Sequence, residues 1–185
     1  MNKENTALVI IDVQKAFDDN KWGERNNPQA EENINKLLTL WREKGWKVIH
    51  IQHLSDNPGS LFHPENEGFA IKDLVEPLEE EIVITKKVNS GFIGTNLEQV
   101  LQSNGITKVV ITGLTTPHCV STTTRMSGNL GFETYLISDA TAAFGMKDQN
   151  DTYYDAETLH AISLATLHEE FATVLTTEQL VSDIQ

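Results

Sequence analysis

The sequence holds a single cysteine, Cys119, and two ionisable residues, Asp12 and Lys86, that each follow a β-rich run. A cysteine thiolate attacks carbonyl carbons, and a carboxylate can accept the thiol proton and return it to a leaving nitrogen. A lysine beside both groups would stabilise the thiolate and keep the carboxylate ionised. If the fold brings these side chains together, they predict nucleophilic hydrolysis.

The residues around Cys119 place it in the first turn of a predicted helix. Thr116 is a suitable N-cap, Pro117 suits the first helical position, and Cys119 then falls at the third. The free N–H groups and the positive end of the helix dipole would lower the thiol pKa and could hold an oxyanion. The alternative is an inert buried cysteine, which is the commoner state of a cysteine in a protein.

Asp12 and Lys86 each have a structural alternative as well. Asp12 follows the apolar run Ala7–Ile11 and could cap a loop at the end of a buried strand, where a carboxylate needs a partner such as Lys86. Lys86 could be an ordinary solvated lysine, because Lys87 beside it carries the same charge. The residue types alone leave these alternatives open.

Six β-rich runs alternate with helical patterns along the chain. This alternation predicts right-handed crossovers and therefore a parallel sheet with helices on both faces. We expect a doubly wound, three-layer αβα sandwich of the Rossmann-like α/β class, with residues 1–185 forming one domain. Ligands bind such sheets beyond the carboxyl ends of the strands. The expected strands are Thr6–Val13, Trp46–His53, Glu81–Thr85, Lys108–Thr112, Glu133–Ser138 and Phe171–Leu175.

Apolar spacing and capping residues mark the helices between these runs. Apolar residues at i, i+3, i+4 and i+7 from Ile34 to Trp41 predict a helix that packs on the sheet and ends at Gly45. Thr95–Glu98 and Thr176–Gln179 each have the spacing of a capping box at a helix start.

Composition excludes several classes of partner. The 14 Lys and Arg residues against 27 Asp and Glu give a net charge of −13, which disfavours nucleic acid and an anionic membrane surface. The apolar run Ala7–Ile11 is too short for a membrane span or a signal core. A single cysteine cannot form an intramolecular disulfide, so we expect a cytoplasmic protein.

Four motifs in order resemble the isochorismatase-like cysteine hydrolases, a family that includes nicotinamidase, N-carbamoylsarcosine amidohydrolase and ureidoacrylate amidohydrolase. They are ALVIIDVQKAF at 7–17, ITKKVNSGFIGTNLEQVL at 84–101, GLTTPHCVSTTTRM at 113–126 and LISDATAAF at 136–144. The resemblance implies a six-stranded sheet and a catalytic triad of Asp12, Lys86 and Cys119. It selects Lys86 over Lys87 because the family lysine stands four residues before a Ser and six before a Phe.

The resemblance also implies features that spacing does not reveal. A cis peptide is expected between Leu114 and Thr115, with the amides of Thr115 and Cys119 forming the oxyanion hole. Members of the family commonly form dimers or tetramers, so a homo-oligomer is expected. No cofactor is implied.

Two departures from family patterns narrow the reaction. Isochorismatases proper cleave a vinyl ether and generally lack the nucleophilic cysteine, so Cys119 favours cleavage of a carbon–nitrogen bond. Nicotinamidases carry an Asp-x-His metal motif after the second strand, where this chain has His50 and His53 three residues apart. Residues three apart on a strand point to opposite faces and cannot easily share a metal. We therefore expect no metal.

Aromatic and histidine side chains near the triad are candidates for contacts to a small amide-type substrate. The aromatic residues lie in long connections or at strand-to-helix junctions, where they could close an apolar pocket. The alternative is ordinary loop packing or a subunit contact. The candidate substrate-binding residues are Phe17, Trp22, His53, Phe62, Phe92 and His118.

The function that these observations predict is hydrolysis of a small amide, ureide or lactam through an acyl-thioester intermediate. The alternatives are an isochorismatase-type vinyl-ether hydrolase, and a non-catalytic small-molecule-binding or partner subunit on the same fold. A nucleotide-binding module is disfavoured because the sequence has neither a G-x-G-x-x-G after the first strand nor a G-x-x-x-x-G-K-[ST] motif.

Overall fold

Six strands form one parallel sheet in the order β3-β2-β1-β4-β5-β8. The computed structural model describes residues 1–2 and 4–184. The chain crosses to one side of β1 for β2 and β3 and to the other side for β4, β5 and β8, so the winding reverses at β1. The strands are β1 (Thr6–Ile11), β2 (Lys47–His53), β3 (Ile82–Lys86), β4 (Lys108–Leu114), β5 (Glu133–Ala142) and β8 (Thr173–Leu175).

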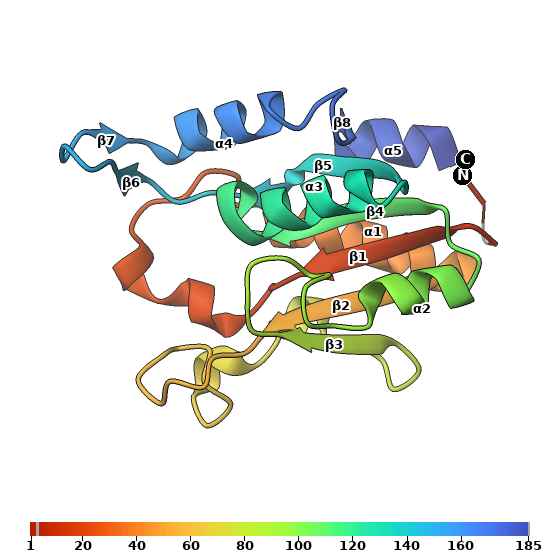
Figure 1. Ribbon diagram of the computed structural model, residues 1–185, viewed down its shortest axis with the longest axis horizontal. Helices are drawn as coiled ribbons and strands as arrows, with labels where there is room; N and C mark the ends of the chain where they lie inside the picture. Colours follow the sequence, from red (N-terminus) through yellow and green to blue (C-terminus); the bar gives the residue numbers. More distant parts are fainter. Residues whose placement is uncertain (3, 185) are drawn as a thin grey trace.

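Helices cover both faces of this sheet, which confirms the predicted three-layer αβα architecture (Figure 1). Helices α1 (Ala30–Lys44) and α5 (Thr177–Ile184) pack on one face in an apolar cluster with Leu8 and Ile10 of β1. Residues of α2 (Leu97–Ser103) share a second cluster with Val9 and Ile11 on the other face, where α3 (Ser121–Asn129) also lies. Because β1 is buried on both faces, its sequence is a continuous apolar run.

Two of the three predicted helix boundaries hold. Gly45 takes the left-handed conformation with φ 61° and ends α1, as predicted. Thr176 and Gln179 exchange hydrogen bonds between side chains and backbone, which confirms the capping box before α5. The box at Thr95–Glu98 is wrong, because Asn96 takes the N-cap position of α2 and the Thr95 hydroxyl oxygen accepts from the Leu97 N–H.

The largest difference from the predicted elements lies after β5. This strand continues to Ala142, beyond the predicted end at Ser138, and its register against β4 shifts between Ile111 and Gly113. The chain then forms a two-stranded hairpin of β6 (Met146–Lys147) and β7 (Tyr153–Tyr154), followed by α4 (Ala156–Ala165). Strands of two residues have no periodicity that a sequence pattern could reveal.

The two long connections lie together at the carboxyl end of the sheet (Figure 1). The connection after β1 contains η1 (Lys15–Asp18) and η2 (Asn20–Trp22), and the one after β2 contains η3 (Glu67–Phe69) and η4 (Asp73–Val75). An isolated bridge joins Gln14 to Ile71, and Glu31 at the start of α1 pairs with both Arg25 and Lys72. These contacts fix one connection against the other.

Within the described residues, no helix combines the length and the apolar character that crossing a bilayer requires.

Candidate active site

Asp12 directly follows β1, at the point where the winding of the sheet reverses. The connections that leave β1 and β4 lead to helices on opposite faces of the sheet, α1 and α3, and α/β sheets bind ligands in the crevice between such connections. The Asp12 backbone has φ 51°, a left-handed conformation that Asp tolerates better than most residues. This turn directs a buried carboxylate to the carboxyl edge of the sheet.

Lys86, the last residue of β3, reaches the same edge. Its Nζ lies 2.6 Å from Asp12 Oδ2, and its side chain is 0% exposed. Lys87 instead forms an exposed ion pair with Asp56. The structure therefore places Lys86 in a buried contact with Asp12 and Lys87 on the surface.

Cys119 completes this cluster from the turn after β4. Its Sγ lies 3.3 Å from Lys86 Nζ, and the Leu114–Thr115 peptide bond is cis, as the resemblance implied. Gly113 has φ 122°, and a Cβ there would lie 2.1 Å from the Ile11 carbonyl oxygen. Only glycine therefore lets the end of β4 approach β1 this closely.

The local helix geometry around Cys119 differs from the predicted one. The turn η5 (Thr116–Val120) is π-helical, and its N-cap position is taken by Thr115 rather than Thr116. The Thr116 hydroxyl is hydrogen-bonded to the buried His160 at 2.8 Å instead. Pro117 therefore stands at the second helical position and Cys119 at the fourth, each one place later than predicted.

The protonation of the cluster also differs from the prediction of a lowered thiol pKa. Burial, with the adjacent Asp12 charge, raises the pKa of Cys119 to about 12, although Lys86 lowers it. Burial also raises the pKa of Asp12, against the lowering influence of Lys86. Both shifts favour a protonated thiol beside a carboxylate that is a stronger base than an ordinary one.

His53 borders the cluster, and His50 does not. His53 Nδ1 lies 3.1 Å from Lys86 Nζ, whereas His50 contacts Glu81 at 3.0 Å. The two rings therefore lie in different environments, as their spacing on β2 predicts.

Oxygen, nitrogen and sulfur atoms of Asp12, His53 and Cys119 lie within 4.8 Å of one another, a spacing that a metal ion could use. The Lys86 ammonium already contacts all three of these side chains, so the donor set fits the lysine cation better than a metal ion.

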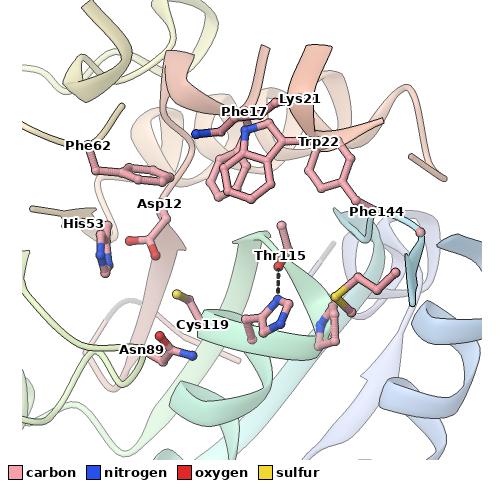
Figure 2. A pocket seen from close by; sticks show the side chains of 14 residues that line it. Asp12, Phe17, Lys21, Trp22, His53, Phe62, Asn89, Thr115, Cys119 and Phe144 are labelled. Carbon is pink, nitrogen blue, oxygen red and sulfur yellow. Dashed lines mark hydrogen bonds between the residues drawn. The ribbon is translucent and has the colours of Figure 1, made fainter. Parts of the chain in front are cut away.

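A cavity of about 420 Å³ opens above these groups. Figure 2 shows aromatic rings on one side of it, facing Asp12, His53, Asn89 and Cys119 on the other. Phe17 stands at the centre of the aromatic wall, with ring centroids 5.3 to 6.0 Å from those of Trp22, Phe62 and Phe144. Five of the six candidate substrate-binding residues line this cavity: Phe17, Trp22, His53, Phe62 and His118.

Phe92, the sixth candidate, lies elsewhere. It is buried in the core cluster that includes Leu97 and stacks on Phe132 at 6.2 Å. After Asn89, the Gly91 N–H donates to Thr123 of α3 and holds this segment against the helix. Phe92, the next residue, then packs in the core. The prediction that Phe92 contacts substrate is therefore corrected.

The sequence did not single out several residues that line the cavity. Phe144 takes the place in the aromatic wall that was expected of Phe92, and Met146 follows it. Asn89 and Lys21 contribute polar groups. The DATAAF motif ends at Phe144, but no local pattern distinguishes a pocket phenylalanine from a core one.

His118 lies beside the nucleophile without pairing with it. Its Nδ1 is 3.0 Å from the Thr115 hydroxyl; this contact is the dashed line that starts at Thr115 in Figure 2. Burial lowers the pKa of His118. The ring therefore contributes to the wall of the cavity and holds the Thr115 hydroxyl.

Fold and cavity together define a doubly wound α/β protein with a thiol, a carboxylate and a lysine at its switch point. The sequence profile of the Isochorismatase domain matches residues 6–179, and the chain belongs to the isochorismatase family of hydrolases.

Individual relatives agree with this assignment. The chain is 77% identical over 181 residues to the uncharacterized isochorismatase family protein YrdC of Bacillus subtilis, covering 98% of this chain and 97% of that protein. It superposes with a TM-score of 0.95, at 41% identity, on an isochorismatase-family protein of Chromobacterium violaceum, covering 98% and 94% of the two chains. The ureidoacrylate amidohydrolase RutB of Rhizobium rhizogenes is 28% identical over 210 residues, with coverage of 94% and 85%.

Proposed function

We propose that this chain hydrolyses the carbon–nitrogen bond of a small amide-type substrate, with Cys119 as nucleophile, Asp12 as proton carrier and Lys86 as the stabilising cation. One observation carries the proposal: the buried Lys86 ammonium contacts both Asp12 Oδ2, at 2.6 Å, and Cys119 Sγ, at 3.3 Å, beneath the cavity.

The first step is formation of the nucleophile. Asp12 Oδ1 has no hydrogen-bond partner among the described residues, so this buried oxygen is available to accept the thiol proton. As the proton moves, the negative charge passes from the carboxylate to the sulfur, and Lys86 contacts both atoms throughout. The raised pKa of Asp12 makes this transfer easier than it would be for an ordinary carboxylate.

The second step is attack on the substrate carbonyl. The sulfur bonds to the carbonyl carbon, and the carbonyl oxygen becomes an oxyanion that the N–H groups of Thr115 and Cys119 would stabilise. Asp12 returns the proton to the leaving nitrogen as the carbon–nitrogen bond breaks, which leaves an acyl-thioester on Cys119. Asp12 then takes a proton from water, whose hydroxide displaces the sulfur and releases the acid.

The cavity wall supports a substrate with an apolar body. Four aromatic rings and Met146 line the cavity, and a pocket of this size and character suits a small organic molecule. The relative named as a ureidoacrylate amidohydrolase supports carbon–nitrogen cleavage as the reaction type.

The test is a panel of small amides, ureides and lactams assayed for release of ammonia or amine by wild type and Cys119→Ala. We expect wild type to turn over amides with apolar substituents, Cys119→Ala to lose turnover completely, and its thermal unfolding to match wild type. Mass spectrometry of wild type quenched during turnover should detect the acyl group on Cys119. Wild-type rates in Cys119→Ala, or no turnover of any compound, would contradict the proposal.

A further inference from the structure

The Lys86 ammonium makes a third contact, with His53 Nδ1 at 3.1 Å, that lies outside the proposed triad. An ammonium has three N–H donors and no acceptor. Asp12 Oδ2, Cys119 Sγ and His53 Nδ1 are its three partners among the described residues, one for each donor. Because this side chain is fully buried, every one of the three partners matters: a buried donor without a partner is costly.

This contact fixes the tautomer of His53. An ammonium can only donate, so Nδ1 must accept and carries no proton, and the neutral ring keeps its proton on Nε2. Burial and the charge of Lys86 lower the pKa of His53 to about 4, which agrees with a neutral ring. The titratable groups that face this ring are Lys86, Asp12 and Cys119.

The position of the ring is set by the sheet and by Gln14. His53 and Lys86 are register partners on the paired strands β2 and β3. The Gln14 side chain donates to the His53 carbonyl and accepts from the His53 N–H, at 3.0 and 2.8 Å. The Phe62 ring packs edge-on at 5.1 Å. His53 is therefore held in place before any substrate arrives.

We propose that His53 is a positioning residue, whose Nδ1 holds the third N–H of Lys86 and so keeps the ammonium between Asp12 and Cys119. This inference rests on the proposed function, and it assigns His53 a role other than the substrate contact expected from the sequence. Of the three contacts, that to Cys119 Sγ is the longest, at 3.3 Å. Loss of the His53 acceptor would let the ammonium turn, and the contact to sulfur would loosen first, because a thiol sulfur is a weaker acceptor than the Asp12 carboxylate.

Two variants of nearly equal size separate this role from simple space-filling. His53→Asn places an acceptor oxygen near the position of Nδ1, and His53→Leu has no acceptor. We expect iodoacetamide to alkylate Cys119 of His53→Leu about tenfold more slowly at pH 8 than wild type, which is about 1.4 kcal/mol of lost thiolate stabilisation. His53→Asn should stay within about threefold of wild type, because its amide oxygen can accept the Lys86 N–H.

Nitrogen-15 NMR of the wild-type imidazole is a second measurement that depends on neither variant. It should show His53 unprotonated at Nδ1 and protonated at Nε2 between pH 6 and 8. A proton on Nδ1 would overturn the inference, as would alkylation of His53→Leu and His53→Asn at equal rates.

Steady-state kinetics then distinguish positioning from substrate contact. In His53→Leu we expect kcat to fall with KM nearly unchanged, whereas a substrate-binding role predicts a raised KM in both variants. Alkylation and NMR need no substrate. If no amide is turned over, the proposed function fails while these two measurements still decide whether His53 positions Lys86.

Discussion

Two buried polar clusters flank strand β2, and each contains one of its histidines. At the carboxyl edge, His53 contacts Lys86, which pairs with Asp12. Toward the other end, His50 contacts Glu81, which pairs with Arg42. Each cluster contains a carboxylate, a cation and an imidazole. The clusters differ in how many of the carboxylate oxygens have a hydrogen-bond partner.

Glu81 has a partner for each of its oxygens. Arg42 donates to Oε1 and Oε2 at 2.7 and 2.8 Å, and His50 and the Leu78 N–H also contact Oε2. Burial alone would raise the pKa of Glu81, but these hydrogen bonds lower it to about 2. Asp12 has one oxygen without a partner, and burial raises its pKa.

The hydrogen bonds to its oxygens therefore distinguish a structural carboxylate from a reactive one. A carboxylate whose lone pairs are all engaged is held ionised and has no reason to exchange a proton. A buried carboxylate with one free oxygen is costly for folding, and such groups concentrate at sites where a proton must move. Asp12 fits the second description and Glu81 the first.

Matched acid-to-amide substitutions give the largest expected contrast. Asp12→Asn removes the proton carrier, so we expect kcat to fall about 10³-fold, within the range for general acid–base catalysis. Glu81→Gln, at the opposite end of β3, should leave kcat within about twofold of wild type. Steady-state assays on one substrate compare the two. Equal losses would abolish the distinction between the clusters.

Removing the cation from each cluster should give a smaller contrast in activity. Lys86→Met takes the positive charge from both Asp12 and the developing thiolate, and we expect kcat to fall about 100-fold, or about 2.7 kcal/mol in activation free energy. Arg42→Met should destabilise folding and leave kcat nearly unchanged.

Lys87→Met is the matched control for Lys86→Met, because it removes the neighbouring charge from an exposed ion pair. We expect its kcat and its free energy of unfolding to stay close to wild type. A comparable loss of activity in Lys87→Met would show that net charge near the cavity, rather than the contact of Lys86, matters.

The smallest effect concerns stability and its pH dependence. Glu81→Gln loses charge-assisted hydrogen bonds, so we expect roughly 2 kcal/mol less free energy of unfolding at pH 7. The pKa of Glu81 is lowered from its ordinary 4.5 to about 2, so its contribution is fully present above the ordinary value and is lost as the pH falls toward 2. Urea unfolding from pH 6 to pH 2.5 should show the wild-type and variant curves converging. Parallel curves would contradict this assignment.

Much of the fold follows from local patterns. The apolar run of β1, the stripe of α1 and the exchange between Thr176 and Gln179 each depend on residues close in sequence. The box at Thr95 failed because α2 begins one residue later than predicted, with Asn96 at the N-cap, so the Thr95 hydroxyl oxygen accepts from the Leu97 N–H. The hairpin of β6 and β7 was not predicted, because strands of two residues are too short to show an alternating pattern.

Within the site, residue order determined the positions of Asp12, Lys86 and Cys119, since parallel strands deliver the residues that follow them to one edge of a sheet. Tertiary contacts were needed to show that Phe144 rather than Phe92 faces the cavity, that His53 accepts from Lys86, and that burial raises the pKa of the thiol. The physical reason is that strand and helix periodicity depends on near neighbours. Burial, solvation and the partner of a buried charge depend instead on segments that meet only after folding.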